Sequence, residues 1–296
     1  MVSTLLLNPI SYLAIAAILL VGVPHGGLDG AVARRSGWPQ HRTAWLSFHA
    51  VYIGLAALVA WLWWLAPLTS LIVFLGISAF HFGSSDICHI ESPSHPRAWP
   101  ALTANAGLVT IAIPTFQAGT VGPLFTVLVG FENSIWLLAQ IQNIFLPWML
   151  TVFGFVIYAL WVPQWRVVLA NLLFLIILAY SLPPLVSFAL YFCCWHSRRH
   201  LQRTWRSLPV DHRRRCGREA LLYSLMAYSA GALFLLWYKS QGLESLSELS
   251  SAIIQLTFIG LAALTVPHML LVDFFDKAPL SLSHPQPTTI RDYKDA

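Results

Sequence analysis

Charged residues are scarce in this chain of 296 residues, and their scarcity excludes a water-soluble fold. Asp, Glu, Lys and Arg together make up 10% of the sequence, whereas hydrophobic residues make up 57%. A single soluble core cannot bury that much apolar surface. A helix of about 20 apolar residues crosses a bilayer. We therefore predict an all-α integral membrane protein, a polytopic bundle of about eight or nine transmembrane helices.

Three further absences narrow the class of protein. The only cysteines are Cys88, Cys193, Cys194 and Cys216, too few for an extracellular disulfide scaffold, so we expect reduced thiols. The chain has no G-x-G-x-x-G or P-loop pattern and thus shows no nicotinamide or flavin site. No Lys or Arg precedes the first apolar stretch, which is expected to remain as the first span rather than act as a signal peptide.

Apolar runs between charged or Pro/Gly-rich segments predict the membrane spans. The stretch 114–144 contains Gly119, Gly122, Pro123 and Glu132 and is predicted as a loop with an interfacial helix. Models with eight or ten spans stay open. The nine predicted spans lie near 5–23, 43–65, 69–88, 99–113, 145–162, 167–182, 184–202, 218–238 and 250–271.

The basic residues predict the orientation of these spans. If the N-terminus lies outside, every Lys and Arg except Lys239 falls on the inner side, as cytoplasmic loops require. The net charge of +5 is thereby explained without a nucleic-acid partner. We predict a cytoplasmic C-terminus, one transmembrane domain over residues 1–278, and a tail over 279–296 that includes a tag-like segment at 292–295.

Histidines are the polar residues that the membrane spans retain. Five of the eleven lie in or at the ends of predicted spans that all run inwards, so their imidazoles are expected at one level of the inner leaflet. They are His25, His81, His196, His200 and His268. The others, at 41, 49, 89, 95, 212 and 284, lack comparable neighbours and are interpreted as solvated or structural.

The spacing and surroundings of these five histidines indicate a metal site. His196 and His200 are four residues apart, which places both on one helical face. Neutral imidazoles suit Fe, Zn or Cu. We predict His25, His81, His196 and His200 as ligands, with Asp29, Asp86 and His268 as hydrogen-bonding partners around them. The alternative is that each is an interfacial or buried, hydrogen-bonded histidine.

Four motifs that extend from the first span to the last carry a resemblance to a known family. They are P-H-G-G-L-D at 24–29, F-H-F-G-S-S-D at 80–86, W-H-S-R-R-H at 195–200 and P-H-M-L-L-V-D at 267–273. In this order the chain resembles the Brp/Blh family of bacterial and archaeal β-carotene 15,15′-dioxygenases. The first motif of that family often has Ala where this chain has Gly27.

The resemblance implies a non-haem Fe(II) enzyme of the cytoplasmic membrane that uses O2 to cleave the central double bond of β-carotene into two retinal molecules. It implies that the same four histidines bind the iron, and that retinal is passed to a microbial rhodopsin. The metal site would lie toward the cytoplasmic leaflet, and no oligomeric state is implied. We expect the substrate-binding site to be lined by aromatic residues, namely Phe80, Phe82, Tyr191, Phe192, Trp195, Tyr223 and Tyr228.

Three rival interpretations stay open. A carotenoid or retinal carrier with a structural metal would bind a polyene without converting it. A di-iron desaturase or hydroxylase needs about eight histidines in three boxes, whereas this chain has one H-x-x-x-H and no H-x-x-H-H. A b-type cytochrome would place paired histidines on either side of haem.

Overall fold

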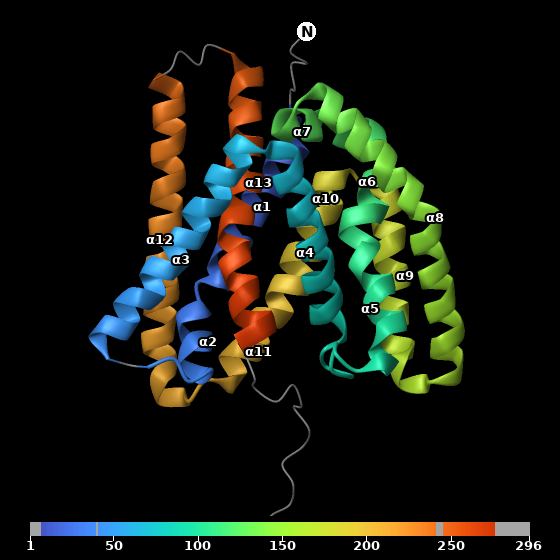
Figure 1. Ribbon diagram of the computed structural model, residues 1–296, viewed down its shortest axis with the longest axis horizontal. Coiled ribbons are helices and arrows are strands. Elements are labelled where there is room, and N and C mark those ends of the chain that lie inside the picture. The colour runs from blue at the N-terminus through green and yellow to red at the C-terminus, as the bar shows by residue number, and fades with distance from the viewer. Residues whose placement is uncertain (1–6, 40, 241–244, 276–296) are drawn as a thin grey trace, which may run out of the picture.

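The chain folds as a bundle of helices, which confirms the predicted all-α class. The computed structural model describes residues 7–39, 41–240 and 245–275, and within these ranges no residue lies in a strand. Figure 1 shows α1 (Pro9–Gly26), α4 (Pro67–Ile87) and α13 (Leu246–Met269) in the middle of the bundle. On one side of them lie α3 (Arg42–Leu65) and α12 (Val210–Ser240). On the other side lie α5 (Trp99–Gly107), α8 (Phe131–Trp161) and α9 (Arg166–Ser181).

Shorter helical segments join these long helices. The α-helical ones are α2 (Asp29–Arg35), α6 (Ile113–Phe116), α7 (Ala118–Val129), α10 (Pro184–Ala189) and α11 (Arg198–Ser207). The 3₁₀ segments are η1 (Pro96–Ala98) and η3 (Pro163–Trp165), and the π-helical segments are η2 (Leu108–Ala112), η4 (Leu190–Ser197) and η5 (Leu270–Phe275). Local chemistry explains several starts: Asn8 caps α1, Pro67 opens α4, and Ser245 with Glu248 forms a capping box on α13.

Seven helices in the described part of the chain are long and apolar enough to cross a membrane. An eighth crossing is obtained if the pair 96–116 and 118–129, bent by 105°, counts as one broken span. The structure therefore has seven or eight candidate spans in its described part. The prediction of about eight or nine spans agrees with the larger of these two counts. The run 184–207 is not counted among them, and its second half carries His196, His200 and several arginines.

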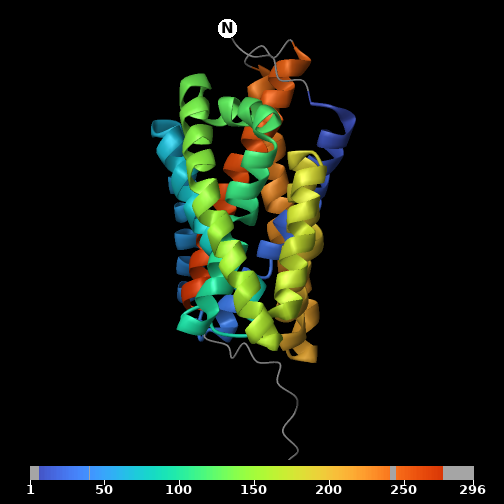
Figure 2. The same ribbon diagram turned by 90° about the vertical axis from the view of Figure 1, so that its right-hand side faces the viewer.

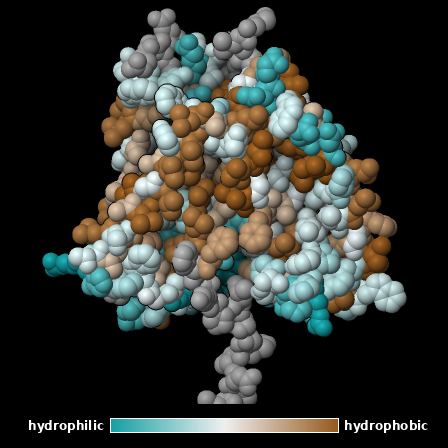
Figure 3. All heavy atoms as spheres, viewed as in Figure 1, coloured by the Kyte–Doolittle hydropathy of each residue, from teal (hydrophilic) through white to brown (hydrophobic). Residues whose placement is uncertain are grey.

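The surface of the molecule matches that of a protein in a bilayer. Figure 3 shows hydrophobic side chains across the middle of one face and hydrophilic ones gathered toward its upper and lower ends. Seen from the side, the long helices run roughly parallel to one another along the height of the molecule (Figure 2). Large apolar side chains such as Leu46, Trp64 and Leu146 are exposed over this surface, as contact with lipid requires.

The segment 114–144 differs from its prediction as a loop with an interfacial helix. Its first part forms α6 and α7, but α8 already begins at Phe131 and continues for 31 residues. The turn between α7 and α8 is made by Gly130, whose φ of +85° favours glycine. Glu132 lies in the first turn of α8, where its negative charge interacts favourably with the positive end of the helix dipole. This interaction favours a helix start at that position.

Close packing of α4 against α5 fixes the position of one histidine helix. A Cβ atom on Gly83 would lie 2.8 Å from the carbonyl oxygen of Leu102 and 3.2 Å from the Cα of Ala106. A larger residue would push these two helices apart, as at other close helix crossings in membranes. Gly83 follows His81 by two residues, so this contact holds the histidine end of α4 in place.

Candidate metal centre

Four histidines from three parts of the chain form a buried row, which we call the histidine row. The ring centroids of His196 and His81 are 5.0 Å apart, those of His81 and His268 are 5.6 Å apart, and those of His268 and His200 are 5.0 Å apart. Each residue is 6% exposed or less. The prediction that these histidines share one membrane level therefore agrees with their positions in space.

Two members of the histidine row are hydrogen-bonded to carboxylates through Nδ1. Nδ1 of His81 lies 2.9 Å from Oδ2 of Asp273, and Nδ1 of His268 lies 2.7 Å from Oδ1 of Asp29. The hydroxyl of Tyr52 donates to the other oxygen of Asp29 at 2.8 Å. A carboxylate at Nδ1 keeps the proton of a neutral imidazole on that nitrogen and leaves Nε2 as a lone-pair donor, an arrangement common around metal ions.

The chemistry of these side chains fits a first-row divalent metal. Nε2 of His81 is buried and has no hydrogen-bond partner among the described residues, although a buried polar nitrogen ordinarily has one. Within the described residues, however, no three His, Cys, Asp or Glu side chains are arranged closely enough to hold an ion. His25, the fourth predicted ligand, lies near the end of α1, and its side chain is outside the described part of the structure. The ligand set therefore stays a prediction.

Local helix geometry explains how the histidine row is assembled. His196 lies in the π-helical segment η4, and Asp273 lies in another, η5. Segments of π-helix are rare and occur often at functional sites, because the wider turn reorients side chains. Pro267 directly precedes His268 within α13 and removes one backbone hydrogen bond there. These irregular segments turn His196, His268 and Asp273 toward the end of α4.

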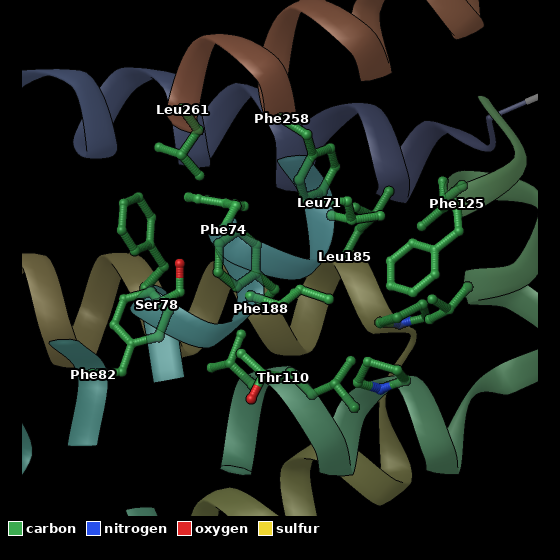
Figure 4. A pocket seen from close by; sticks show the side chains of 18 of the residues that line it. Leu71, Phe74, Ser78, Phe82, Thr110, Phe125, Leu185, Phe188, Phe258 and Leu261 are labelled. Carbon is green, nitrogen blue, oxygen red and sulfur yellow. The ribbon is translucent and has the colours of Figure 1, made fainter. Parts of the chain in front are cut away.

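An apolar cavity, here called the first cavity, begins at this row. His81 and His196 form part of its lining, together with Phe82 and Phe192. Figure 4 shows how Phe74, Phe188 and Phe258 come together from different helices around the same space. The lining continues to Leu124, Phe125 and Leu128 of α7. A long hydrocarbon group would find apolar contacts along this whole path.

A second cavity lies between α1, α3, α12 and α13. Its lining includes Gly26, Asp29 and Leu264, so it meets the histidine row at the carboxylate that holds His268. It also includes His49, whose Nε2 lies 2.8 Å from the hydroxyl oxygen of Tyr223. The second cavity therefore contains several polar groups that are already hydrogen-bonded.

The predicted substrate-lining residues divide between these two cavities and other places. Phe82 and Phe192 line the first cavity, and Tyr223 lines the second. Phe80 is 44% exposed and lines neither cavity, because a neighbouring helix position points about 100° away. Sequence reasoning gave the correct motif here but not the side that each aromatic residue faces.

Three other aromatic residues from that prediction have structural partners. Tyr191 is buried against the ring of Phe82, at a centroid distance of 5.3 Å. Trp195 stacks under the guanidinium of Arg199. Tyr228 donates a hydrogen bond to the carbonyl oxygen of Leu19. None of the three lines either cavity.

Asp86 has a different partner from the imidazole that we expected. Its Oδ2 accepts a hydrogen bond of 3.0 Å from the hydroxyl of Tyr191, and no histidine among the described residues is bonded to it. Asp86 lies five positions after His81, which turns it about 140° away on a regular helix. The carboxylate that does hold His81 is Asp273, at the end of the fourth motif.

Sequence reasoning missed Asp273, Tyr52 and His49. Asp273 belongs to P-H-M-L-L-V-D, so its presence in a histidine motif was a usable signal. Tyr52 and His49 lie in α3, a span that carries no recognised motif. Contacts of α3 with α13 and α12 bring these two side chains to the site, and no sequence pattern predicts those contacts.

Arginines gather at the end of the bundle that holds the histidine row. Arg34 of α2 pairs with Glu219 of α12. Just beyond the end of α4, burial lowers the pKa of His89, and the positive charges of Arg199 and Arg203 lower it further. This concentration of basic groups agrees with the predicted cytoplasmic side, although the orientation itself stays a prediction.

Fold and site together define a multi-pass helical membrane protein whose buried histidines suit a first-row metal. A family model described as beta-carotene 15,15′-dioxygenase matches residues 16–276. The chain therefore belongs to the β-carotene 15,15′-dioxygenase family, and its predicted identification as an enzyme of this type is confirmed.

Two relatives of this chain carry similar names. A beta-carotene 15,15′-dioxygenase of the uncultured marine bacterium 66A03 is 35% identical over 268 residues, which cover 90% of this chain and 94% of the relative. A probable beta-carotene 15,15′-dioxygenase Blh of Halobacterium salinarum is 24% identical over 295 residues, covering 89% of this chain and 83% of the relative. No solved structure matches the chain.

Proposed function

We propose that this chain is an integral membrane, iron(II)-dependent dioxygenase that cleaves the central 15,15′ double bond of β-carotene with O2 and forms two retinal molecules. The observation that carries the proposal is the buried histidine row at the end of an apolar cavity. The names of the relatives supply the substrate and the bond cleaved.

The proposed iron ligands are His25, His81, His196 and His200. Bound there, iron would supply the redox chemistry that makes O2 reactive beside a polyene. His268 shares the row and is backed by Asp29, so its role is that of a partner of the ligands. A nitrogen-rich, buried donor set of this kind suits a redox metal better than a structural calcium or magnesium ion would.

The protein's own groups have three tasks in this proposal. Asp273 and Asp29 hold the Nδ1 protons of His81 and His268, which keeps both rings in one orientation. The apolar walls of the first cavity bind hydrocarbon and exclude water from the reacting centre. Tyr52 fixes the orientation of Asp29 by a hydrogen bond.

Two cavities that meet the histidine row at different points support cleavage at the centre. β-Carotene has two equal halves, and it dissolves in the bilayer rather than in water. If one half occupies the first cavity and the other half the second, the central bond comes to lie beside the histidines. An enzyme with only one such cavity would place one end of the carotenoid, rather than its central bond, beside the histidines.

The proposal extends to the place of the enzyme in the cell. We assign it to a bacterial or archaeal cytoplasmic membrane, with its N-terminus outside, its C-terminus inside and its metal site toward the cytoplasmic leaflet. Retinal would leave into the same bilayer, from which a microbial rhodopsin could take it. A C-terminal reporter that is active only in the cytoplasm tests the orientation, and activity of a reporter specific to the outside would contradict it.

The experiment that tests the function uses bacterial cells that accumulate β-carotene. The intact chain, His196→Ala and a control, His212→Ala, are expressed, and retinal and residual carotene are measured by chromatography. His212 is a fitting control because it is a histidine whose side chain is 65% exposed, away from the row. Retinal should form with the intact chain and the control only. Bound but unconverted carotene would favour a carrier instead.

A further inference from the structure

One hydroxyl in the first cavity has no partner among the described residues, although most of the residues that line this cavity are apolar. Ser78 lies in α4 and is 3% exposed, and its Oγ has no hydrogen-bond partner among the described residues. It belongs to the lining of the first cavity, and Figure 4 shows its side chain among the others that line this space. A buried polar group of this kind calls for an explanation, because leaving it unbonded is unfavourable.

The ordinary explanation for a serine in a helix does not apply to Ser78. Helical Ser and Thr side chains usually donate to the backbone carbonyl one turn earlier. Thr110 does so within the same cavity, with its Oγ1 at 3.2 Å from the carbonyl oxygen of Ala106. Ser224 and Thr257 do the same elsewhere in the bundle. The hydroxyl of Ser78 is therefore available to something inside the cavity.

The position of Ser78 indicates where that group would lie. Ser78 precedes His81 by three residues on α4, so the two side chains share one face of the helix. Both line the first cavity. A molecule bound there would need an apolar body along the phenylalanines and leucines, with one acceptor atom at the histidine end.

A polyene aldehyde has this distribution of polarity, whereas a hydrocarbon does not. Cleavage of a carbon–carbon double bond by O2 gives each half one carbonyl oxygen at the carbon where the bond was cut. That carbon lies at the histidine end if the reacting bond does. The substrate offers no acceptor to Ser78, and the product half offers one.

We propose that the first cavity contains a product subsite in which Ser78 donates its hydroxyl proton to the aldehyde oxygen of a bound retinal. The assignment rests on the proposed function, since that reaction supplies the aldehyde. Ser78 binds the product through this hydrogen bond and holds its carbonyl group at the end of the cavity. Retinal would thus bind more tightly than a hydrocarbon of the same shape.

The test measures binding to the purified full chain in lipid nanodiscs without turnover. All-trans-retinal is titrated and followed by quenching of tryptophan fluorescence, and the titration is repeated with axerophthene, which has a methyl group in place of the aldehyde. Ser78→Ala should weaken retinal binding about 3- to 10-fold, as loss of one hydrogen bond does, and should change axerophthene binding less than about 2-fold. Ser224→Ala is the matched control, because that buried hydroxyl lies outside the first cavity and already donates to the carbonyl oxygen of Ala220, and it should leave both affinities nearly unchanged.

A vibrational measurement separates a hydrogen bond from a change of shape. The carbonyl stretch of bound retinal should move to higher frequency in Ser78→Ala, and Ser78→Cys, a weaker donor, should fall between the two. Equal loss of retinal and axerophthene affinity, or an unchanged carbonyl stretch, would overturn the proposal.

The outcome can be separated from a failure of the proposed function. Retinal formation by the intact chain in cells is measured independently of these titrations. If the intact chain forms retinal but Ser78→Ala binds it normally, only the product subsite is wrong. If the intact chain forms no retinal, the proposed function fails, whatever the titrations show.

Discussion

The first and second cavities meet the same histidine row but differ in size and in the helices that line them. The first cavity reaches the row at His81 and His196 and has a volume of about 100 Å³. The second reaches it through Asp29 and measures about 290 Å³. The first is walled by leucines and phenylalanines from helices in the middle of the bundle, whereas the second lies beside α3 and α12, of whose membrane-spanning windows only 6% is buried.

This difference indicates separate roles for the two cavities. Pockets for ligands of this size ordinarily measure about 300–1,000 Å³. Under the proposed function, the first cavity would have to widen, for example by rotation of its aromatic side chains, before it could hold half of a carotenoid. The second already has nearly enough room and adjoins the helices that are most exposed to lipid. We infer that the second cavity admits the substrate and that the first selects its end group.

The largest expected effect comes from removing a histidine of the row rather than a histidine of the second cavity. His81→Ala should reduce retinal formation by about 1,000-fold or more, because a proposed ligand and its carboxylate contact are both lost. His49→Ala should lower retinal formation less than about 10-fold, since the hydrogen bonds of His49 within the described residues go to Tyr223 and the Trp45 carbonyl. Retinal and iron content are measured for both variants at equal membrane expression. Equal losses of retinal formation in the two variants would contradict the distinction between histidines of the row and histidines that only line a cavity.

The carboxylates behind the row should give the next largest effects. Asp273→Asn and Asp29→Asn should each lower iron retention or activity by about 10- to 100-fold, because an amide cannot hold an Nδ1 proton as a carboxylate does. Asp86→Asn is the matched control and should change iron retention less than about 3-fold, since Asp86 bonds Tyr191 instead. Iron is quantified in the purified variants by mass spectrometry. A loss in Asp86→Asn as large as in Asp273→Asn would restore the role expected for Asp86 from its motif.

The contrast between Asp86 and Asp273 shows how far sequence reasoning reaches. Composition and apolar runs were sufficient for the all-α membrane class, because bilayer thickness imposes the length of each span. Alternation of span direction led us to expect His81, His196, His200 and His268 at one level, and these four side chains form the histidine row. These properties depend on local sequence and on a constraint common to all membrane proteins.

Contacts between distant helices could not be predicted in the same way. Whether Asp86 or Asp273 meets His81 depends on helix rotation and on the π-helical segment η5, which no apolar pattern reveals. Two polar residues of the second cavity, His49 and Tyr52, come from α3, whose sequence indicates only a lipid-facing span. The extension of α8 over 131–144 was missed for a related reason, since Glu132 reads as a loop residue until its place in the first helical turn is known.

The smallest effects should come from filling each cavity in turn. Val109→Phe adds volume to the tight first cavity and should lower turnover of β-carotene by about 10-fold, because overpacking there opposes the widening that the ring requires. Ala56→Leu adds volume to the roomier second cavity and should lower it only about 3-fold. A shorter apocarotenal that lacks one ring should be affected by Val109→Phe but spared by Ala56→Leu, because it does not need the second cavity to its full extent. Ala57→Leu, at an exposed neighbouring position of α3, is the control and should change neither substrate. The measurement is the steady-state rate in nanodiscs with each of the two substrates. If Ala56→Leu slows turnover of the apocarotenal as much as that of β-carotene, both molecules occupy the two cavities in the same way, which would contradict the prediction.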